Sequence, residues 1–348
     1  MASSGSAATT SDVLPARARY PAGVLVALAG TGLLLVAAFW DLAIGARPLS
    51  ASQVVGGLFG HGNVLDVEIV RSIRLPRVLM AAVIGLDLAM SGVIMQGLTA
   101  NPLAAPDIVG VSAGAALVVV AAATVFAQIH GTALVLLGFA GAGIAAFGVL
   151  GLAGVGQGRT SPVRMALAGV TVTAMLLAFT QALLLLHQNG TAGIFFWLVG
   201  GVNFAQWSDL LVILPWTAIG AAGAMLLAVA LNILALGDDV ARGVGLNVDR
   251  TRLLGVLCVV CLAGAAVAVS GPVAFIGLIV PHTTRRLVGN NHLLVIPLAG
   301  LLGATLLTFA DVGARFVQFP FETPSGIVTA LLGAPFFLYL ARRHRASA

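Results

Sequence analysis

Long apolar segments recur along almost the whole chain and alternate with short stretches rich in turn residues and arginine. A helix needs about 20 apolar residues to cross the hydrocarbon core of a bilayer. The pattern therefore predicts an all-α polytopic membrane protein with about ten transmembrane helices. The expected spans are residues 22–43, 76–98, 108–127, 131–154, 163–187, 208–235, 251–270, 273–288, 293–315 and 325–341. The Ser/Ala-rich residues 1–20 are expected to form a disordered tail, and residues 21–348 a single transmembrane domain.

Charged residues make up only 8% of the 348 residues, whereas hydrophobic residues make up 59%. Soluble globular proteins carry about 25% charged residues, so this composition excludes a soluble fold. All 17 basic residues are arginines. A P-loop ATPase needs a lysine to hold the β- and γ-phosphates, and this chain has none. Any ATP-driven step is therefore expected from a partner subunit, and no catalytic residues are expected here.

The arginines also predict the orientation, because cytoplasmic loops of membrane proteins are enriched in basic residues. With ten spans and a cytoplasmic N-terminus, twelve arginines lie on the inner side and five on the outer side. The outer five are Arg47, Arg71, Arg74, Arg77 and Arg315. We therefore expect both termini in the cytoplasm.

A short pattern recurs at an offset of 179 residues. Ser91-Gly92 returns as Ser270-Gly271, Pro102 as Pro281, and Val109-Gly110 as Val288-Gly289. The first copy begins in a span that runs inward and the second in a span that runs outward. The chain is therefore expected to hold two inverted-topology repeats, near residues 74–190 and 250–341, an arrangement in which transporters place the substrate path near the repeat interface.

Two arginines flank Pro76, which suits the first turn of a helix. Cations at a helix N-terminus are opposed by the helix dipole by about 0.3–1 kcal/mol each. Arg74 and Arg77, with Arg71 just upstream, therefore favour either an acidic partner or lipid headgroups at this position. Further along, Asp311 and Arg315 have the i,i+4 spacing of an intrahelical ion pair.

The most polar stretch between expected spans is residues 236–252, which contains Gly237, Gly243 and Gly245. A plain connection between helices needs about two to eight residues. The length and polarity of this loop favour a docking element for a partner over a plain connector.

Asp87 falls in the middle of the second expected span. A charge at the bilayer centre costs about 2.5–3.5 kcal/mol on insertion scales. Two interpretations remain open: local hydrogen bonding, or a proton-coupling role.

No metal site or cofactor is expected. The histidines His61, His130 and His187 lack the spacing of metal ligands. Cys258 and Cys261 lie three apart in an apolar run and are interpreted as small residues on a buried helix face.

Taken together, the motifs resemble those of the permease subunits of type II ABC importers, the FecCD-like group that takes up ferric siderophores, haem and cobalamin. The resemblance covers almost the whole chain after Tyr20. Its markers are Arg74-Leu-Pro-Arg77, Ser91-Gly92 with Gln96, Asn101-Pro-Leu-Ala104, Gly110, Trp197 with Gly200, the Gly237–Gly245 loop, Phe275–His282 with Arg285, Ala310-Asp311 with Arg315, Glu322–Gly326 and Gly333-Ala-Pro335.

The resemblance implies roles for individual residues. Arg74, Arg77 and Arg315 would meet glutamates of an extracytoplasmic substrate-binding protein. Loop 237–250 would dock on the ATPase, with Gly237, Asp238, Ala241 and Gly245 on the family pattern. A gate would fall at Thr160-Ser161, and structural turns at Asn101-Pro102 and Pro281-His282. Asp87 departs from the small apolar residue that is usual at its position.

The resemblance also implies an assembly: two permease copies, identical or related, two cytoplasmic ATP-binding subunits and the binding protein, in the bacterial plasma membrane. The expected function is ATP-driven import by alternating access, with a ferric siderophore as the expected substrate. The alternatives are haem or cobalamin import, or a proton-coupled secondary transporter that uses Asp87.

Overall fold

The computed structural model describes residues 16–125, 131–155, 161–187, 192–318 and 321–345, and in these ranges every regular element is a helix. The expected gate residue Thr160 lies outside the described residues. The elements are α1 (Ala16–Ala43), α2 (Ala51–Phe59), α3 (Val64–Glu68), the π-helix η1 (Ile69–Arg74), α4 (Leu75–Thr99), the 3₁₀-helix η2 (Pro106–Val109), α5 (Val111–Val125), α6 (Thr132–Leu152), α7 (Pro162–Leu186), α8 (Ala192–Val199), α9 (Trp207–Leu234), α10 (Asp238–Gly243), α11 (Val248–Val259), the π-helix η3 (Val260–Gly264), α12 (Ala265–Ser270), α13 (Ile276–Val288), α14 (His292–Val317) and α15 (Ser325–Arg345).

Seven helical segments of the described chain are long and apolar enough to cross a membrane. They are Pro21–Ala43, Val64–Thr99, Thr132–Leu152, Pro162–Leu186, Trp207–Leu234, Val248–Ser270 and His292–Val317. Val111–Val125 and Ser325–Leu338 are shorter apolar helices. A helix also occupies the eighth expected span, but α13 has 13 residues, or about 20 Å at 1.5 Å per residue. The protein is thus a polytopic helical membrane protein, and the count of ten crossings stays a prediction.

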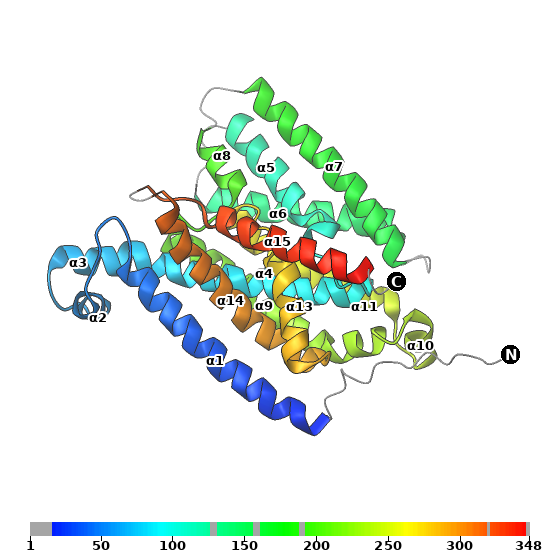
Figure 1. Cartoon of the computed structure of the whole chain (residues 1–348). Coiled ribbons are helices and arrows are strands. Elements are labelled where there is room, and N and C mark those ends of the chain that lie inside the picture. Colours follow the sequence, from blue (N-terminus) through cyan, green and yellow to red (C-terminus); the bar gives the residue numbers. More distant parts are fainter. Residues whose placement is uncertain (1–15, 126–130, 156–160, 188–191, 319–320, 346–348) are drawn as a thin grey trace.

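Helix α4 lies at the centre of the bundle and packs against α14, α13, α9 and α11 (Figure 1). Small residues allow this close approach, as they do in other membrane bundles. A Cβ atom at Gly85 would overlap the backbone of Gly303 on α14, and one at Gly303 would overlap Gly85. Gly92 meets the backbone of Gly277 on α13 in the same way, so α4 and α13 are also in backbone contact.

The peripheral helices expose much of their apolar surface. In the most apolar window of α1 and of α7 only 17% of the residues are buried, against 78% in the segment that contains α4. Helices α1 and α7 lie on opposite sides of the bundle in Figure 1. Their exposed Leu, Val and Phe side chains require a lipid or protein environment.

The positions of the sequence repeat differ in local structure. Pro102 follows α4 in a turn, whereas Pro281 lies inside α13, so the expectation of a second turn at Pro281-His282 was wrong. Proline has no backbone N–H, and at this place in α13 it leaves the carbonyl of Gly277 without its usual helical donor. That is the carbonyl that faces Gly92. The duplication as a whole stays a prediction.

Candidate functional site

The N-terminal end of α4 holds a group of six charged residues, which we call the arginine cluster. Its members are Arg74, Arg77, Arg315, Asp41, Asp311 and Glu322. They come from α1, η1, α4, α14 and the segment before α15. All except Glu322 are buried.

Two of the arginines close the C-terminal end of α1, whose last carbonyl groups have no donor within the helix. The Arg74 guanidinium donates from Nη1 to the Leu42 carbonyl at 2.6 Å and from Nη2 to the Arg47 carbonyl at 2.5 Å. Arg315 Nη1 donates to the carbonyls of Asp41, at 2.8 Å, and Ile44. Both cations therefore lie where the α1 dipole favours positive charge.

Carboxylates pair with the remaining donors. Arg315 Nη2 donates to Asp41 Oδ1 and, at 3.3 Å, to Asp311 Oδ2, which confirms the expected i,i+4 pair on α14. Arg77 donates to Asp311 through two nitrogens, Nε at 2.7 Å and Nη2 at 3.0 Å. Its Nη1 donates to Glu322 Oε2 at 2.5 Å. The acidic partner expected for the α4 N-terminus is therefore present within the chain.

Asp41 and Glu322 are the members that sequence reasoning missed. Asp41 contacts a residue 274 positions away, and Glu322 one 245 positions away, so no local spacing reveals either pair. One signal was present for Asp41, because a carboxylate at the end of an apolar span needs a partner.

Two further arginines, Arg47 and Arg71, lie exposed beside the cluster. Arg47 forms an ion pair with Asp66 at 2.9 Å. Arg71 donates to the carbonyl of Leu58 at 2.8 Å, and within the described part of the chain it has no acidic partner. Of these cations, Arg71 is therefore the one best placed to meet an incoming anion.

At the far end of the bundle, α10 projects beyond the long helices (Figure 1). Gly237 precedes it with a φ of 103°, and Gly245 follows it with a φ of 86°, both in the left-handed region that favours glycine. Ala241 is fully buried, and the exposed polar residues face outward. The wholly buried Arg252 of α11 donates to Asp238 at 3.0 Å, so α10 is attached to α11 by an ion pair.

The remaining predicted residues belong neither to the arginine cluster nor to the α10 segment. Asp87 is fully buried in α4, and its Oδ2 accepts a hydrogen bond from Thr217 Oγ1 of α9 at 2.8 Å. Ser161 caps α7 by accepting from the backbone N–H of Arg164 at 3.3 Å. Asn101 Oδ1 accepts from the N–H of Leu103 at 2.9 Å and so stabilises the turn after α4.

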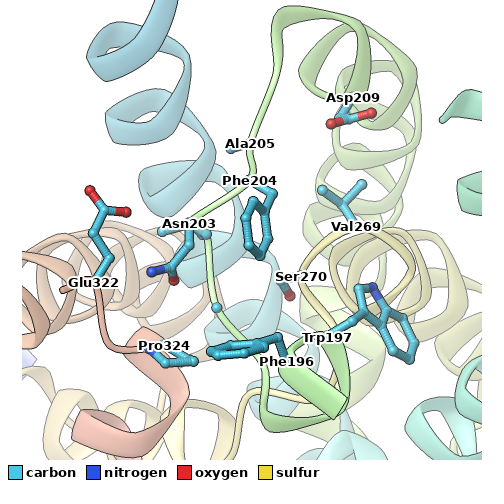
Figure 2. A pocket seen from close by; sticks show the side chains of 12 residues that line it. Phe196, Trp197, Asn203, Phe204, Ala205, Asp209, Val269, Ser270, Glu322 and Pro324 are labelled. Atoms are coloured by element: carbon cyan, nitrogen blue, oxygen red, sulfur yellow. The ribbon is translucent and has the colours of Figure 1, made fainter. Parts of the chain in front are cut away.

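A cavity of about 140 Å³ lies next to the arginine cluster and includes Glu322 in its wall (Figure 2). Aromatic side chains and polar groups both line it. The lining residues are Phe196, Trp197, Gly201, Val202, Asn203, Phe204, Ala205, Asp209, Val269, Ser270, Glu322 and Pro324. Sequence reasoning did not find this cavity, because its residues come from α8, α9, α12 and two loops.

Comparisons with known proteins identify the family. The model of the FecCD transport family matches residues 33–343. The chain is 42% identical over 338 residues to the iron(3+)-hydroxamate import system permease protein FhuB of Bacillus subtilis. This alignment covers 97% of this chain and 88% of FhuB. The chain is 40% identical over 311 residues to the ferric enterobactin transport system permease protein FepD of Escherichia coli, covering 89% and 93%.

Two further comparisons extend the range. The cobalamin import system permease protein BtuC of Halobacterium salinarum is 40% identical over 279 residues, covering 79% of this chain and 73% of that one. A solved structure of a chain provisionally assigned as a metal-chelate type ABC transporter, in an inward-facing conformation, superposes with a TM-score of 0.79 at 30% identity, covering 92% and 99%. The chain therefore belongs to the FecCD transport family and is a membrane-embedded permease subunit of an ABC importer, not an enzyme.

Proposed function

We propose that this permease imports ferric siderophores, with hydroxamate siderophores as the first candidates. The observation that carries the proposal is the 42% identity to a ferric hydroxamate permease across 97% of the chain. Relatives named for ferric citrate and ferric enterobactin support the broader class. Cobalamin is the second candidate, because a cobalamin permease is 40% identical over 79% of the chain.

The proposed assembly contains two permease subunits, two cytoplasmic ATP-binding subunits and an extracytoplasmic binding protein. The chain contributes one transmembrane domain, residues 21–348, with ten crossings and both termini in the cytoplasm. Exposed apolar side chains on α7 and α9 support a partner surface there, and the absence of lysine supports a separate ATPase.

The arginine cluster is proposed to lie on the outer side and to receive acidic residues of the binding protein, through Arg74, Arg77 and Arg315. The exposed Arg47 and Arg71 would make the first contact, because rim charges steer association. In this arrangement the adjacent cavity lies at the outer mouth of the transport path.

The α10 segment, residues 237–250, is proposed to dock on the ATP-binding subunit. Its position beyond the long helices and its ion pair with α11 support this role. Motion of the ATPase would reach α11 through Asp238 and Arg252. A gate at Thr160-Ser161 and the turn at Asn101-Pro102 are proposed on the same side.

Transport in proteoliposomes tests the proposal. Permease and ATPase are reconstituted with ATP inside vesicles that carry the binding protein outside, and radioactive iron is supplied as a ferric trihydroxamate. ATP-dependent uptake that excess cobalamin does not inhibit is the expected result. Cobalamin uptake without iron uptake would favour the second candidate. Uptake driven by a pH gradient without the ATPase would contradict ATP-driven import.

A further inference from the structure

The Arg77 guanidinium is almost inaccessible from outside the protein. Its side chain is only 5% exposed, although the proposed function requires a carboxylate of another protein to reach it. Three of its nitrogens already donate to carboxylates of this chain. A further carboxylate can reach this guanidinium only where one of the present partners leaves.

The two present partners differ in how firmly they are held. Asp311 is fully buried in α14, receives two bonds from Arg77 and contacts Arg315 as well. Glu322 is 45% exposed, receives a single bond at 2.5 Å and lies in the short segment before α15. Bidentate pairs are stronger than single contacts, and an exposed carboxylate recovers its hydration when it is released. Glu322 is therefore the exchangeable partner.

The charge balance leads to the same conclusion. The arginine cluster contains three cations and three carboxylates, so it is formally neutral with Glu322 in place. Adding a fourth carboxylate would place an uncompensated negative charge among buried groups, which is costly. Replacing Glu322 by the carboxylate of a partner keeps the balance.

We propose that Glu322 occupies the position of a partner's carboxylate and is exchanged for it on docking. This inference rests on the proposed docking of an acidic binding protein at the cluster. Before docking, Glu322 satisfies the buried Arg77. During docking, a glutamate or aspartate of the partner takes the Nη1 position and Glu322 turns away from α4.

The segment that carries Glu322 also forms part of the cavity wall, so the exchange affects the cavity. Glu322 and Pro324 both line the cavity, and Figure 2 shows Glu322 at its edge near Asn203. The Thr323 carbonyl accepts a hydrogen bond from Asn203 Nδ2 at 3.3 Å. The Gly326 N–H donates to the Gly200 carbonyl at 3.0 Å. Release of Glu322 therefore alters one wall of the cavity, and docking is coupled to its shape.

Binding measurements on paired variants test the exchange. The permease–ATPase complex is placed in lipid nanodiscs and titrated with the binding protein that supports uptake in the reconstituted system. Glu322→Gln removes the competing charge, so its Kd is expected to fall about tenfold. Glu68→Gln is the matched control, because Glu68 is exposed and directly precedes η1, which carries Arg74, and its removal changes only the general charge. A Kd for Glu322→Gln equal to or above that of Glu68→Gln would overturn the proposal.

A second measurement keeps Glu322 in place. A spin label is attached to cysteine at the exposed Phe321, with Cys258 and Cys261 replaced by alanine. Its spectrum is expected to become more mobile when the binding protein binds. Binding with an unchanged spectrum would refute the exchange and leave docking intact. Absence of binding to the complex with native Glu322 would instead contradict the proposed docking itself.

Discussion

Arg315 shows how a single residue joins two helices, α1 and α14. Its guanidinium binds two carbonyls at the end of α1, the carboxylate of Asp41 and the carboxylate of Asp311. Removing one partner of a buried ion pair is more costly than never having formed it, because the other charge remains buried. The stability of this end of the bundle therefore depends on complete pairing.

Arg315→Gln is expected to lower the free energy of unfolding by about 3–5 kcal/mol, the usual cost of a broken buried pair. SDS-induced unfolding in mixed micelles measures the change. Arg71→Gln serves as the control, and its exposed side chain predicts a change below about 1 kcal/mol. The double variant Arg315→Gln with Asp41→Asn should recover part of the loss. Equal losses of unfolding free energy in Arg315→Gln and Arg71→Gln would contradict the role of burial.

Asp87 is fully buried in α4. The sequence allowed two interpretations of Asp87, local hydrogen bonding and proton coupling. The hydrogen bond that it accepts from Thr217 corresponds to the first. A carboxylate that only accepts this bond can be replaced by an amide, whose oxygen accepts in the same way.

Asp87→Asn is therefore expected to keep ATP-dependent uptake within about twofold of the native rate, and Thr217→Val to cost about 1 kcal/mol of stability. Uptake assays and SDS unfolding measure the two effects. Loss of uptake in Asp87→Asn with unchanged folding would instead assign a transport role to the carboxyl group.

At the scale of elements, apolar pattern and helix length predicted most boundaries well. The second expected span, 76–98, corresponds to Leu75–Thr99, and the ninth, 293–315, to His292–Val317. The length of an apolar run and the hydrogen bonds within a helix are local properties, so the sequence indicates where helices begin and end. The ion pairs of Arg77 and the cavity depend on residues more than 100 positions apart, and no local pattern contains that information. Pro281 was misjudged because helix packing tolerates a proline whose freed carbonyl is close to a neighbouring glycine.

The conformation of the α10 segment depends on Gly245. Proline requires a φ near −65°, whereas Gly245 has a φ of 86° and its N–H donates to the Arg242 carbonyl at 3.0 Å. Gly245→Pro is therefore expected to distort the segment and to reduce uptake per ATP hydrolysed about tenfold or more. Parallel assays of ATPase activity and uptake measure this ratio.

Gly243→Ala is the control, because a Cβ atom there meets no neighbouring atom and the backbone is helical. It should leave the ratio unchanged. Normal coupling in Gly245→Pro would refute the role proposed for this segment in transmission.

Across the whole molecule, two regions rich in charged residues lie at opposite ends of a largely apolar bundle. One is the arginine cluster with its exposed neighbours, and the other is the α10 segment with α11. Each region would bind a different soluble partner. The apolar helices between the two regions would connect binding at one end with binding at the other. The sequence predicted both regions and their separation, but it did not predict that Arg74, Arg77 and Arg315 would be buried.

Exposed Arg71 provides the corresponding prediction. Reversal of its charge in Arg71→Glu is expected to slow association with the binding protein about three- to tenfold at low salt, because surface charge steers encounters. Stopped-flow fluorescence measures the rate. The difference should shrink at 1 M salt, where the Debye length is about 3 Å. Arg242→Glu, at the other end, should leave this rate unchanged. A salt-independent effect would indicate altered structure instead of steering.

The direct contact of Gly85 with Gly303 limits how the molecule can change shape. Shear motion between helices needs a layer of side chains that can slide, and here backbone lies against backbone. Helices α4 and α14 are therefore expected to move together as one rigid unit. Because the arginine cluster joins α1 to this pair, movement during transport is expected among the helices attached less tightly. Among the other long spans, α7 has the smallest buried share, at 17%.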